Sequence, residues 1–352
     1  MIIFYPFIIA FIITAVITPL SLIIIKKMGL VDDPKRHKHP GMIHKKPTPR
    51  GGGIPLFLGI VIAGIFFLPL TKAVIALFAA GSIALFTGIV DDKYDISPYL
   101  RFIVNIAVAL IVVTAGITVP FITNPFGGIL FLNSISFHFG FFTIILSDVI
   151  AILWIIWVMN MLNWSKGVDG QMPGIVAISA LTIGILSLRF GISDPSSQIA
   201  ANLSFIIAGA SLGFLIFNFH PARIFPGYGA TAVYLLLSAV SILSGAKLAT
   251  AILVMGVPMI DGIFTIMRRV LSGRSPFWHD KKHLHHLLLS FGIGQRYIAL
   301  FYWIISAILG TLALVLSSQA KLFAIIMLLI VVGGSLLFLH RILKNTYDED
   351  RL

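Results

Sequence analysis

The chain has 352 residues, of which 58% are hydrophobic and only 11% are charged, and it contains no cysteine. Soluble domains average about 45–50% apolar and about 25% charged residues, so this composition excludes a soluble globular protein and a disordered protein. The lack of cysteine excludes a disulfide scaffold and a thiolate metal site. The composition predicts a polytopic membrane protein that has the lipid bilayer, and no nucleic acid, as its partner.

Eleven apolar stretches of the sequence are candidates for transmembrane helices, which require about 20 mostly apolar residues each. We therefore expect an all-α polytopic membrane fold that forms a single domain over residues 1–352. In chain order the expected spans are Ile2–Ile25, Gly53–Leu70, Lys72–Val90, Phe102–Pro120, Asp148–Asn163, Pro173–Phe190, Gln198–Phe219, Gly229–Ser244, Lys247–Met267, Tyr297–Leu316 and Lys321–Leu339.

The net charge of +12 predicts how these helices are oriented. With the N-terminus outside, the outer connections carry only Lys72, Arg189, Lys247 and Lys321, which leaves 21 of the 25 basic residues on the other side. Because basic residues concentrate in cytoplasmic loops, we expect a cytoplasmic C-terminus. The cytoplasmic segments are then 26–52, 91–101, 160–172, 219–229 and 267–297.

One further apolar stretch, Phe121–Leu146, is interrupted by glycine, asparagine and proline and alternates in its side chains. This pattern predicts a short β-hairpin on the outer face. Nearly all polar chemistry lies in the five cytoplasmic segments instead. The asymmetry favours an enzyme that works at the inner surface of the cytoplasmic membrane, since a channel would place ionisable groups along its spans.

The first segment is strongly basic, contains His44 and ends in Pro47-Thr48-Pro49-Arg50-Gly51-Gly52-Gly53. A polybasic loop attracted to anionic lipid would explain the charge alone. The prolines and glycines indicate more, because they stiffen the loop and let backbone N–H groups approach an anion. A lipid phosphate is the target that we expect.

The second segment begins with the adjacent carboxylates Asp91 and Asp92 at the end of the third span. A solvated helix terminus is the simple interpretation. Adjacent carboxylates repel each other beside a bilayer, so the pair also indicates a bound cation or a proton-transfer role.

The third segment places Asn160 and Asn163 on one helix face. Their amides could bind a nucleobase, supply an oxygen to a metal, or cap the end of the helix. The fourth segment reads as an aromatic turn with one arginine. The fifth contains Asp261 inside a span, which requires a partner or a wet cavity. It ends in the cluster His283, His285 and His286, which suits a metal or a phosphate.

In this order and between these spans, the segments resemble the polyprenyl-phosphate N-acetylhexosamine-1-phosphate transferases of glycosyltransferase family 4. Within that family the sequence is most similar to the bacterial branch that acts on undecaprenyl phosphate and UDP-N-acetylglucosamine (UDP-GlcNAc). The residues that carry the resemblance are Gly29–Asp32, Pro47–Arg50, Gly88–Asp92, Phe217–Ala222, Val257–Asp261, Arg268–Arg269, Ser275–Phe277 and His283–His286.

The resemblance implies transfer of a sugar 1-phosphate, expected to be GlcNAc 1-phosphate, from a UDP-sugar to undecaprenyl phosphate, with release of UMP. It also implies Mg²⁺ as cofactor and a possible homodimer. Asp91 and Asp92 would be catalytic or, with Asn163, hold the metal. The substrate-binding positions would be Arg50, His44, Asn160, Asn163, Lys166, Asp169, Tyr228, His283, His285 and His286.

Two positions depart from the motifs of the family. Lys166 replaces the first Asp of the motif Asn-x-x-Asn-x-x-Asp-Gly-x-Asp-Gly, in which Asp169 is kept, and Tyr228 replaces the Asp of the motif Phe-Met-Gly-Asp-x-Gly-Ser. Lysine and a phenol hydroxyl can both bind phosphate, and together they could take the place of the metal. The alternatives are therefore an active transferase with a rebuilt phosphate site and an inactive relative. The latter would bind polyprenyl phosphate or a nucleotide sugar as a regulatory or assembly subunit.

Overall fold

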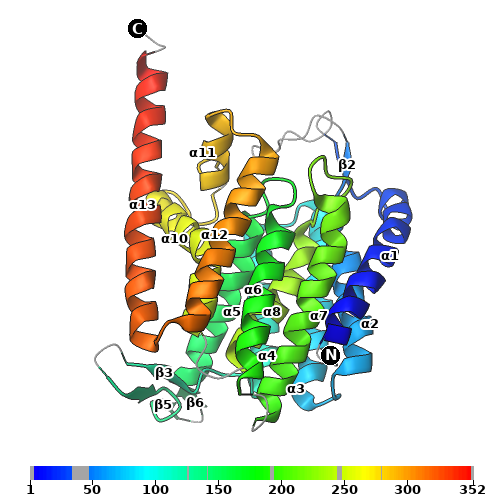
Figure 1. Cartoon of the computed structure of the whole chain (residues 1–352), viewed down its shortest axis with the longest axis vertical. Helices are drawn as coiled ribbons and strands as arrows, with labels where there is room; N and C mark the ends of the chain where they lie inside the picture. Colours follow the sequence, from blue (N-terminus) through cyan, green and yellow to red (C-terminus); the bar gives the residue numbers. More distant parts are fainter. Residues whose placement is uncertain are drawn as a thin grey trace.

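The computed structural model describes residues 4–33, 47–124, 127–140, 142–190, 194–243, 248–278 and 280–349. Figure 1 shows helices lying side by side in a bundle, with short hairpins at one end and α11 at the opposite end. The helices are α1 (Tyr5–Lys27), α2 (Gly53–Phe67), α3 (Lys72–Tyr94), α4 (Pro98–Thr114), α5 (Leu146–Trp164), α6 (Gln171–Leu188), α7 (Pro195–Asn218), η2 (Tyr228–Ala230), α8 (Thr231–Leu243), α9 (Leu248–Val254), α10 (Gly256–Leu271), α11 (Leu284–Ser290), α12 (Gln295–Val315) and α13 (Ser318–Glu349).

Each of the apolar stretches expected to span the membrane is helical. Within the described ranges, α1, α3, α5, α6, α7, α12 and α13 are long and apolar enough to cross a bilayer, and α9 with α10 forms an eighth candidate. The shorter apolar helices α2, α4 and α8 occupy the other three predicted spans. The all-α polytopic fold is therefore confirmed, while the count of eleven spans and their orientation stay predictions.

The stretch expected to be one straight span, Lys247–Met267, is instead broken. Helices α9 and α10 meet at an angle of 84°. The break precedes Gly256 and Pro258, and the proline has no N–H to donate to the carbonyl of Val254. The bend matters for function because α10 carries Asp261 and Arg269.

The stretch Phe121–Leu146 forms two antiparallel hairpins, where the sequence predicted one. Strands β3 (Phe121–Thr123) and β4 (Ile129–Phe131) pair with each other, and so do β5 (Ser136–Phe139) and β6 (Phe142–Ile145). The stretch contains two separate turns, and the short first hairpin is complete before the second begins. Two strands of the amino-terminal half, β1 (Val31–Asp32) and β2 (Thr48–Pro49), pair at the other end of the molecule.

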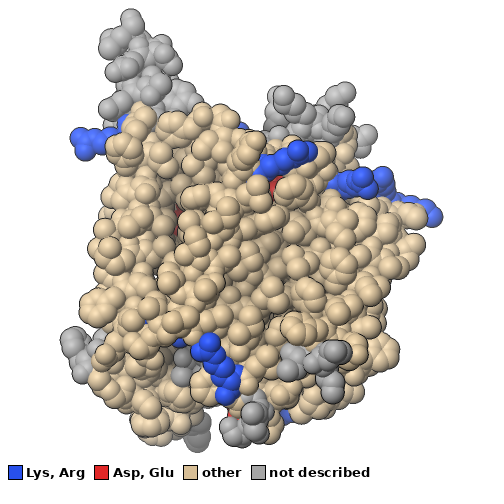
Figure 2. Space-filling view, in the orientation of Figure 1, with Lys and Arg blue, Asp and Glu red and all other residues tan. Residues whose placement is uncertain are grey.

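The core of the bundle lies on α6, α7 and α8. Nearly all residues of α8 are buried, and so are most residues of α6 and α7. The helices around it present apolar side chains outward, and only 6% of the apolar window of α13 is buried. Figure 2 shows a face made mostly of uncharged residues, with lysine and arginine near its two ends. Such an apolar belt marks an integral membrane protein.

Candidate active site

All five polar segments predicted from the sequence meet at one cavity of about 250 Å³. It lies at the end of the bundle that carries α11 and β2 (Figure 1). We call it the polar cavity. Its wall includes Asp32, Arg50, Arg101, Asn160, Asn163, Trp164, Lys166, Pro226, Gly227, Tyr228, Arg269, Phe277, Trp278, Asp280, His283, His285 and His286.

Backbone hydrogen bonds join the first segment to the fourth, although more than 170 residues separate them. The N–H groups of Gly52 and Gly53 donate to the carbonyls of Phe225 and Pro226, both at 2.8 Å. The loop also packs tightly on α3, because a Cβ added at Gly88 would lie 2.2 Å from the backbone of Gly229. These contacts place Arg50 beside the loop that carries Tyr228.

Asp92 is the point at which α3, the first segment and the fourth segment converge. Its Oδ1 accepts hydrogen bonds from Arg50 Nε and from the backbone N–H of Tyr228, both at 2.8 Å. A Cβ at Gly227, whose φ is +66°, would lie 2.1 Å from the Asp92 carboxylate, so only glycine lets the loop close over it. The side chain of Asp92 is fully buried as a result.

Asp91 belongs to a separate ion pair. Arg101 Nε lies 3.2 Å from Asp91 Oδ1, and Arg101 Nη2 lies 3.4 Å from Oδ1 of the exposed Asp95. The two adjacent carboxylates of α3 are therefore each paired with a different arginine, which offsets their mutual repulsion.

Lys166 lies between these groups and the cavity. Its Nζ donates to the carbonyl of Gly227 at 2.8 Å and lies 5.8 Å from the ring centroid of Tyr228. Burial and, after it, the nearby Arg50 lower the pKa of Lys166, Asp92 and Asp91 oppose them, and the resulting pKa is about 7. An anion bound beside the amine would favour the protonated form.

Tyr228 contacts a second cation and a buried amide. The Arg101 guanidinium carbon lies 5.3 Å from the centroid of its ring. The hydroxyl accepts a hydrogen bond at 3.3 Å from Asn105 Nδ2, which projects from α4. Two cations, Arg101 and Lys166, thus lie over the electron-rich ring of Tyr228.

The two asparagines of the third segment both line the polar cavity. Asn160 Nδ2 donates to the carbonyl of Ile156 at 2.8 Å, which fixes the amide on α5. Asn163 Oδ1 is buried and has no hydrogen-bond partner among the described residues. Asn163 therefore has an acceptor left for a ligand.

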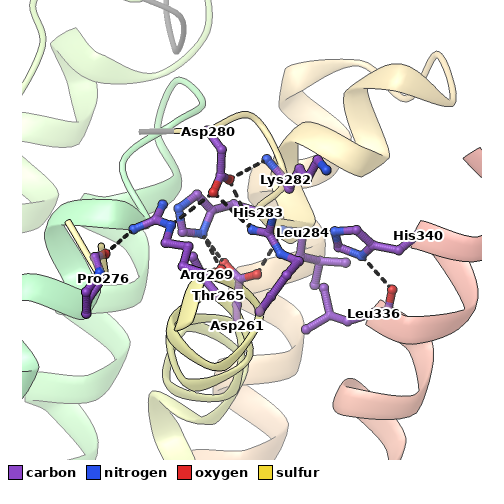
Figure 3. Close-up of polar contacts among 11 residues, drawn as sticks. Asp261, Thr265, Arg269, Pro276, Asp280, Lys282, His283, Leu284, Leu336 and His340 are labelled. Carbon is purple, nitrogen blue, oxygen red and sulfur yellow. Dashed lines mark hydrogen bonds and ion pairs between the residues drawn. The ribbon is translucent and has the colours of Figure 1, made fainter. Parts of the chain in front are cut away.

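The fifth segment forms a polar network that Figure 3 shows in close-up. Asp261 Oδ2 accepts from His283 Nδ1 at 2.9 Å, and Asp261 Oδ1 accepts from the N–H of Leu284 at 3.0 Å. Asp280 accepts from Arg269 Nε at 2.9 Å and from Arg268 Nη2 at 3.1 Å. Burial raises the pKa of Asp280, but the Arg269 and Arg268 contacts outweigh it and lower the pKa to about 2.

The remaining histidines of the cluster are neutral at pH 7. Burial lowers the pKa of His285 well below 6.5, and it lowers that of His286 to about 4. The rings of His283 and His285 stack at 5.6 Å. His285 and His286 therefore offer hydrogen bonds rather than positive charge to a ligand.

Three of the candidate residues that the structure describes are not part of the cavity wall. Asp91 and Asp92 are buried behind it and contact the wall residues Arg101 and Arg50 through ion pairs. Asp169 does not line the cavity, because its Oδ2 accepts from His220 Nδ1 at 2.6 Å and from the N–H of Ala222 at 3.1 Å. The Asp169 carboxylate therefore connects the third segment to the fourth by hydrogen bonds. His44 lies outside the described residues, so its predicted role stays a prediction.

Comparisons with known proteins agree with this arrangement. The model of the family described as "Glycosyl transferase family 4" matches residues 74–245. A probable undecaprenyl-phosphate N-acetylglucosaminyl 1-phosphate transferase of Bacillus subtilis is 32% identical over 335 residues, covering 92% of this chain and 88% of that protein. The chain belongs to glycosyl transferase family 4.

Two further family 4 relatives extend the comparison. A decaprenyl-phosphate N-acetylglucosaminephosphotransferase of Mycobacterium tuberculosis is 32% identical over 362 residues and covers 92% of this chain and 86% of its own. An undecaprenyl-phosphate alpha-N-acetylglucosaminyl 1-phosphate transferase of Escherichia coli is 28% identical, covering 82% and 76%. The family resemblance inferred from the motifs is thus confirmed.

Sequence reasoning did not single out Arg101 or Asn105 of this family 4 chain. Both are polar residues in or beside an apolar stretch, and their spacing of four places them on one face of α4. That spacing was the signal available in the sequence. Their partners, Asp91 and Tyr228, lie on other elements and only the fold identifies them.

The candidate metal ligands beside the polar cavity do not fit the Mg²⁺ that the family resemblance implies. The carboxylates of Asp91 and Asp92 are paired with Arg101 and Arg50, and the Lys166 amine stands beside them. Across the described ranges, there is no group of three or more His, Cys, Asp or Glu side chains that could hold a metal ion. Mg²⁺ prefers a shell of oxygen atoms, and fixed cations beside those oxygens disfavour it.

Proposed function

We propose that this protein transfers GlcNAc 1-phosphate from UDP-GlcNAc to a polyprenyl phosphate such as undecaprenyl phosphate, with release of UMP. The observation that carries the proposal is the convergence of all five polar segments on one cavity. The names of the relatives supply the sugar and the lipid class. They favour an enzyme over the alternative of an inactive relative with a regulatory or assembly role.

The reaction is a phosphoryl transfer. An oxygen of the lipid phosphate attacks the phosphorus that bears the sugar, and the bond from that phosphorus to the UMP oxygen breaks. The electron pair of this bond leaves with UMP. Such a transfer requires alignment of the reacting groups and neutralisation of the charge on the phosphates.

The cavity residues suit both requirements. Arg50, Arg101 and Lys166 supply positive charge on the side of α3. Asp92 itself does not line the cavity; its buried Oδ2 has no hydrogen-bond partner among the described residues and is the oxygen that we propose receives a proton from the lipid phosphate. Asn163, together with the aromatic faces of Trp164 and Trp278, is proposed to bind the uridine.

The setting of the reaction is also part of the proposal. Nucleotide sugars are soluble and the acceptor is a membrane lipid, so a cavity at one end of the helix bundle gives access to both. The basic residues favour the cytoplasmic side of the inner membrane for this end. The possible homodimer stays a prediction.

Purified full-length protein in detergent, mixed with UDP-GlcNAc and undecaprenyl phosphate, tests the function by UMP release. We expect release that requires both substrates and yields a lipid-linked GlcNAc diphosphate. Omission of the lipid separates transfer from hydrolysis of the nucleotide. Protein that unfolds cooperatively on heating but releases no UMP with either UDP-GlcNAc or another UDP-N-acetylhexosamine would refute the proposal.

A further inference from the structure

Of the three basic side chains Arg50, Arg101 and Lys166 that line the polar cavity, only Lys166 has no ion pair with a carboxylate among the described residues. Asp92 pairs with Arg50 at 2.8 Å, and Asp91 pairs with Arg101 at 3.2 Å. Lys166 has no carboxylate within ion-pair distance in the described part of the chain, and its Nζ donates instead to the Gly227 carbonyl at 2.8 Å. Lys166 lines the cavity, so its amine is available to an anionic ligand there.

Tyr228 is the neighbour that positions the Lys166 amine. Its backbone N–H is fixed by Asp92, and its hydroxyl is fixed by Asn105. Its ring lies 5.8 Å from Lys166 Nζ and 5.3 Å from the Arg101 guanidinium carbon. An aromatic ring attracts cations without carrying a charge of its own, so it holds both groups and leaves their charge available to a ligand.

A carboxylate at the position of Tyr228 would instead neutralise one of these cations. A divalent ion at the unpartnered Oδ2 of Asp92 would lie near Arg50 and Lys166, the two cations that act on this carboxylate. This position is unfavourable because like charges repel each other strongly in a buried site. A diphosphate carries the opposite charge and can accept several charge-assisted hydrogen bonds from the same groups.

We propose that Lys166, held by the Gly227 carbonyl and the Tyr228 ring, forms with Arg50 and Arg101 a metal-independent site for the diphosphate of the nucleotide sugar. This inference rests on the proposed function, because it assigns the part of the cavity that binds the donor substrate. The three protein cations perform the charge neutralisation for which the family resemblance implies Mg²⁺.

The test is binding of UDP-GlcNAc to the purified full chain by calorimetry, in excess EDTA and again in excess Mg²⁺. We expect dissociation constants that agree within about threefold, because the ligand uses protein cations in both cases. Lys166→Met should weaken binding in EDTA by about tenfold or more, as expected for loss of a charged donor to phosphate. Lys166→Arg should retain most of the affinity.

Lys93→Met is the matched control. Lys93 is an exposed lysine on the last turn of α3 and does not line the polar cavity. The substitution removes the same charge close to the same carboxylates. Nucleotide affinity should be unchanged, which separates a general loss of positive charge from loss of the Lys166 contact.

A gain of metal dependence gives a second, independent measurement. The double variant Lys166→Asp, Tyr228→Asp replaces one basic and one uncharged neighbour of Asp92 with carboxylates. Its affinity for UDP-GlcNAc should be low in EDTA and rise with Mg²⁺, and Mg²⁺ alone should raise its melting temperature. The wild-type melting temperature should not respond to Mg²⁺ in the same range.

The outcomes distinguish this inference from the proposed function. Wild-type binding that needs Mg²⁺ and disappears in EDTA would overturn the metal-independent site and leave the transferase function intact. No binding of UDP-GlcNAc under either condition would count against the function itself. If Lys166→Met fails to fold, the wild-type comparison and the Lys166→Arg variant still decide the question.

Discussion

The carboxylate of Asp261 fixes the ring of His283 at the wall of the polar cavity. Asp261 comes from the bent helix α10, yet its Oδ2 receives the Nδ1–H of His283 at 2.9 Å (Figure 3). Both side chains are almost fully buried. With Nδ1 occupied, Nε2 is the ring nitrogen left to contact a ligand.

Asp261→Asn should therefore impair activity through the position of His283. An asparagine oxygen can replace only one of the two acceptor oxygens, so either the histidine or the Leu284 N–H loses its partner. Loss of one charge-assisted hydrogen bond of about 1.5 kcal/mol predicts about tenfold slower UMP release. Asp261→Leu should also lower the unfolding free energy by about 1–3 kcal/mol for each unsatisfied donor. An Asp261→Asn variant with wild-type kcat would contradict the positioning role.

Asp92→Asn should reduce UMP release by about a hundredfold or more if Asp92 takes part in proton transfer. The amide retains an oxygen for the Tyr228 N–H but loses the charge that pairs with Arg50, so the melting temperature should also fall. Activity is therefore compared at a temperature at which the variant is folded. Asp95→Asn is the matched control, because Asp95 is 79% exposed and its left-handed φ of 48° suits asparagine. Equal activity of both variants would refute the catalytic assignment of Asp92.

Tyr228→Phe should destabilise the protein while it preserves the ring that lies near Lys166 and Arg101. Removal of the hydroxyl leaves the buried Asn105 amide without its partner, at a cost of about 1–3 kcal/mol. Asn105→Leu in the same background should recover part of the loss, because no polar group then remains unpaired. Thermal unfolding of the two single variants and the double variant measures the coupling. Additive effects would show that the hydrogen bond contributes nothing.

Stability should fall as the pH decreases from about 6.5 to about 4, through His286. Burial lowers the pKa of its ring to about 4, with His283 and Lys281 acting the same way and Asp261 and Asp280 opposing. The unfolded chain takes up a proton near pH 6.5, whereas the folded protein does not until about pH 4. Melting temperatures measured between pH 7.5 and 4.5 should show this slope, to which the buried His285 contributes in the same direction, and His286→Gln should reduce the slope. An unchanged slope in the variant would assign the effect to other groups.

Cysteine labelling tests the predicted orientation, and the natural sequence has no cysteine to interfere. Ser134, between the two hairpins, and Ser275, beyond α10, are both exposed. A membrane-impermeant maleimide applied to intact cells should label Ser134→Cys and leave Ser275→Cys unlabelled until the cells are opened. Labelling of both from outside would exclude the orientation derived from the basic residues.

The sequence alone determined which residues form helices and which segments carry the chemistry. Apolar composition over about 20 residues is a local property, so every expected span is helical. Charged residues are excluded from such stretches, and they therefore gather in the segments between them. The positions of Asn160 and Asn163 at the cavity follow from the same local rule, and so do those of Asp91 and Asp92 at the end of α3.

Only the tertiary structure decided which of these polar residues contact one another. The close approach of Gly88 to Gly229 brings α3 against the fourth segment, and this contact pairs Asp92 with Arg50 and the Tyr228 N–H. Asp169 belongs to the same motif as Lys166, yet its carboxylate is used to hold His220. Ion pairs and hydrogen bonds between distant segments depend on helix packing, which local sequence patterns do not encode.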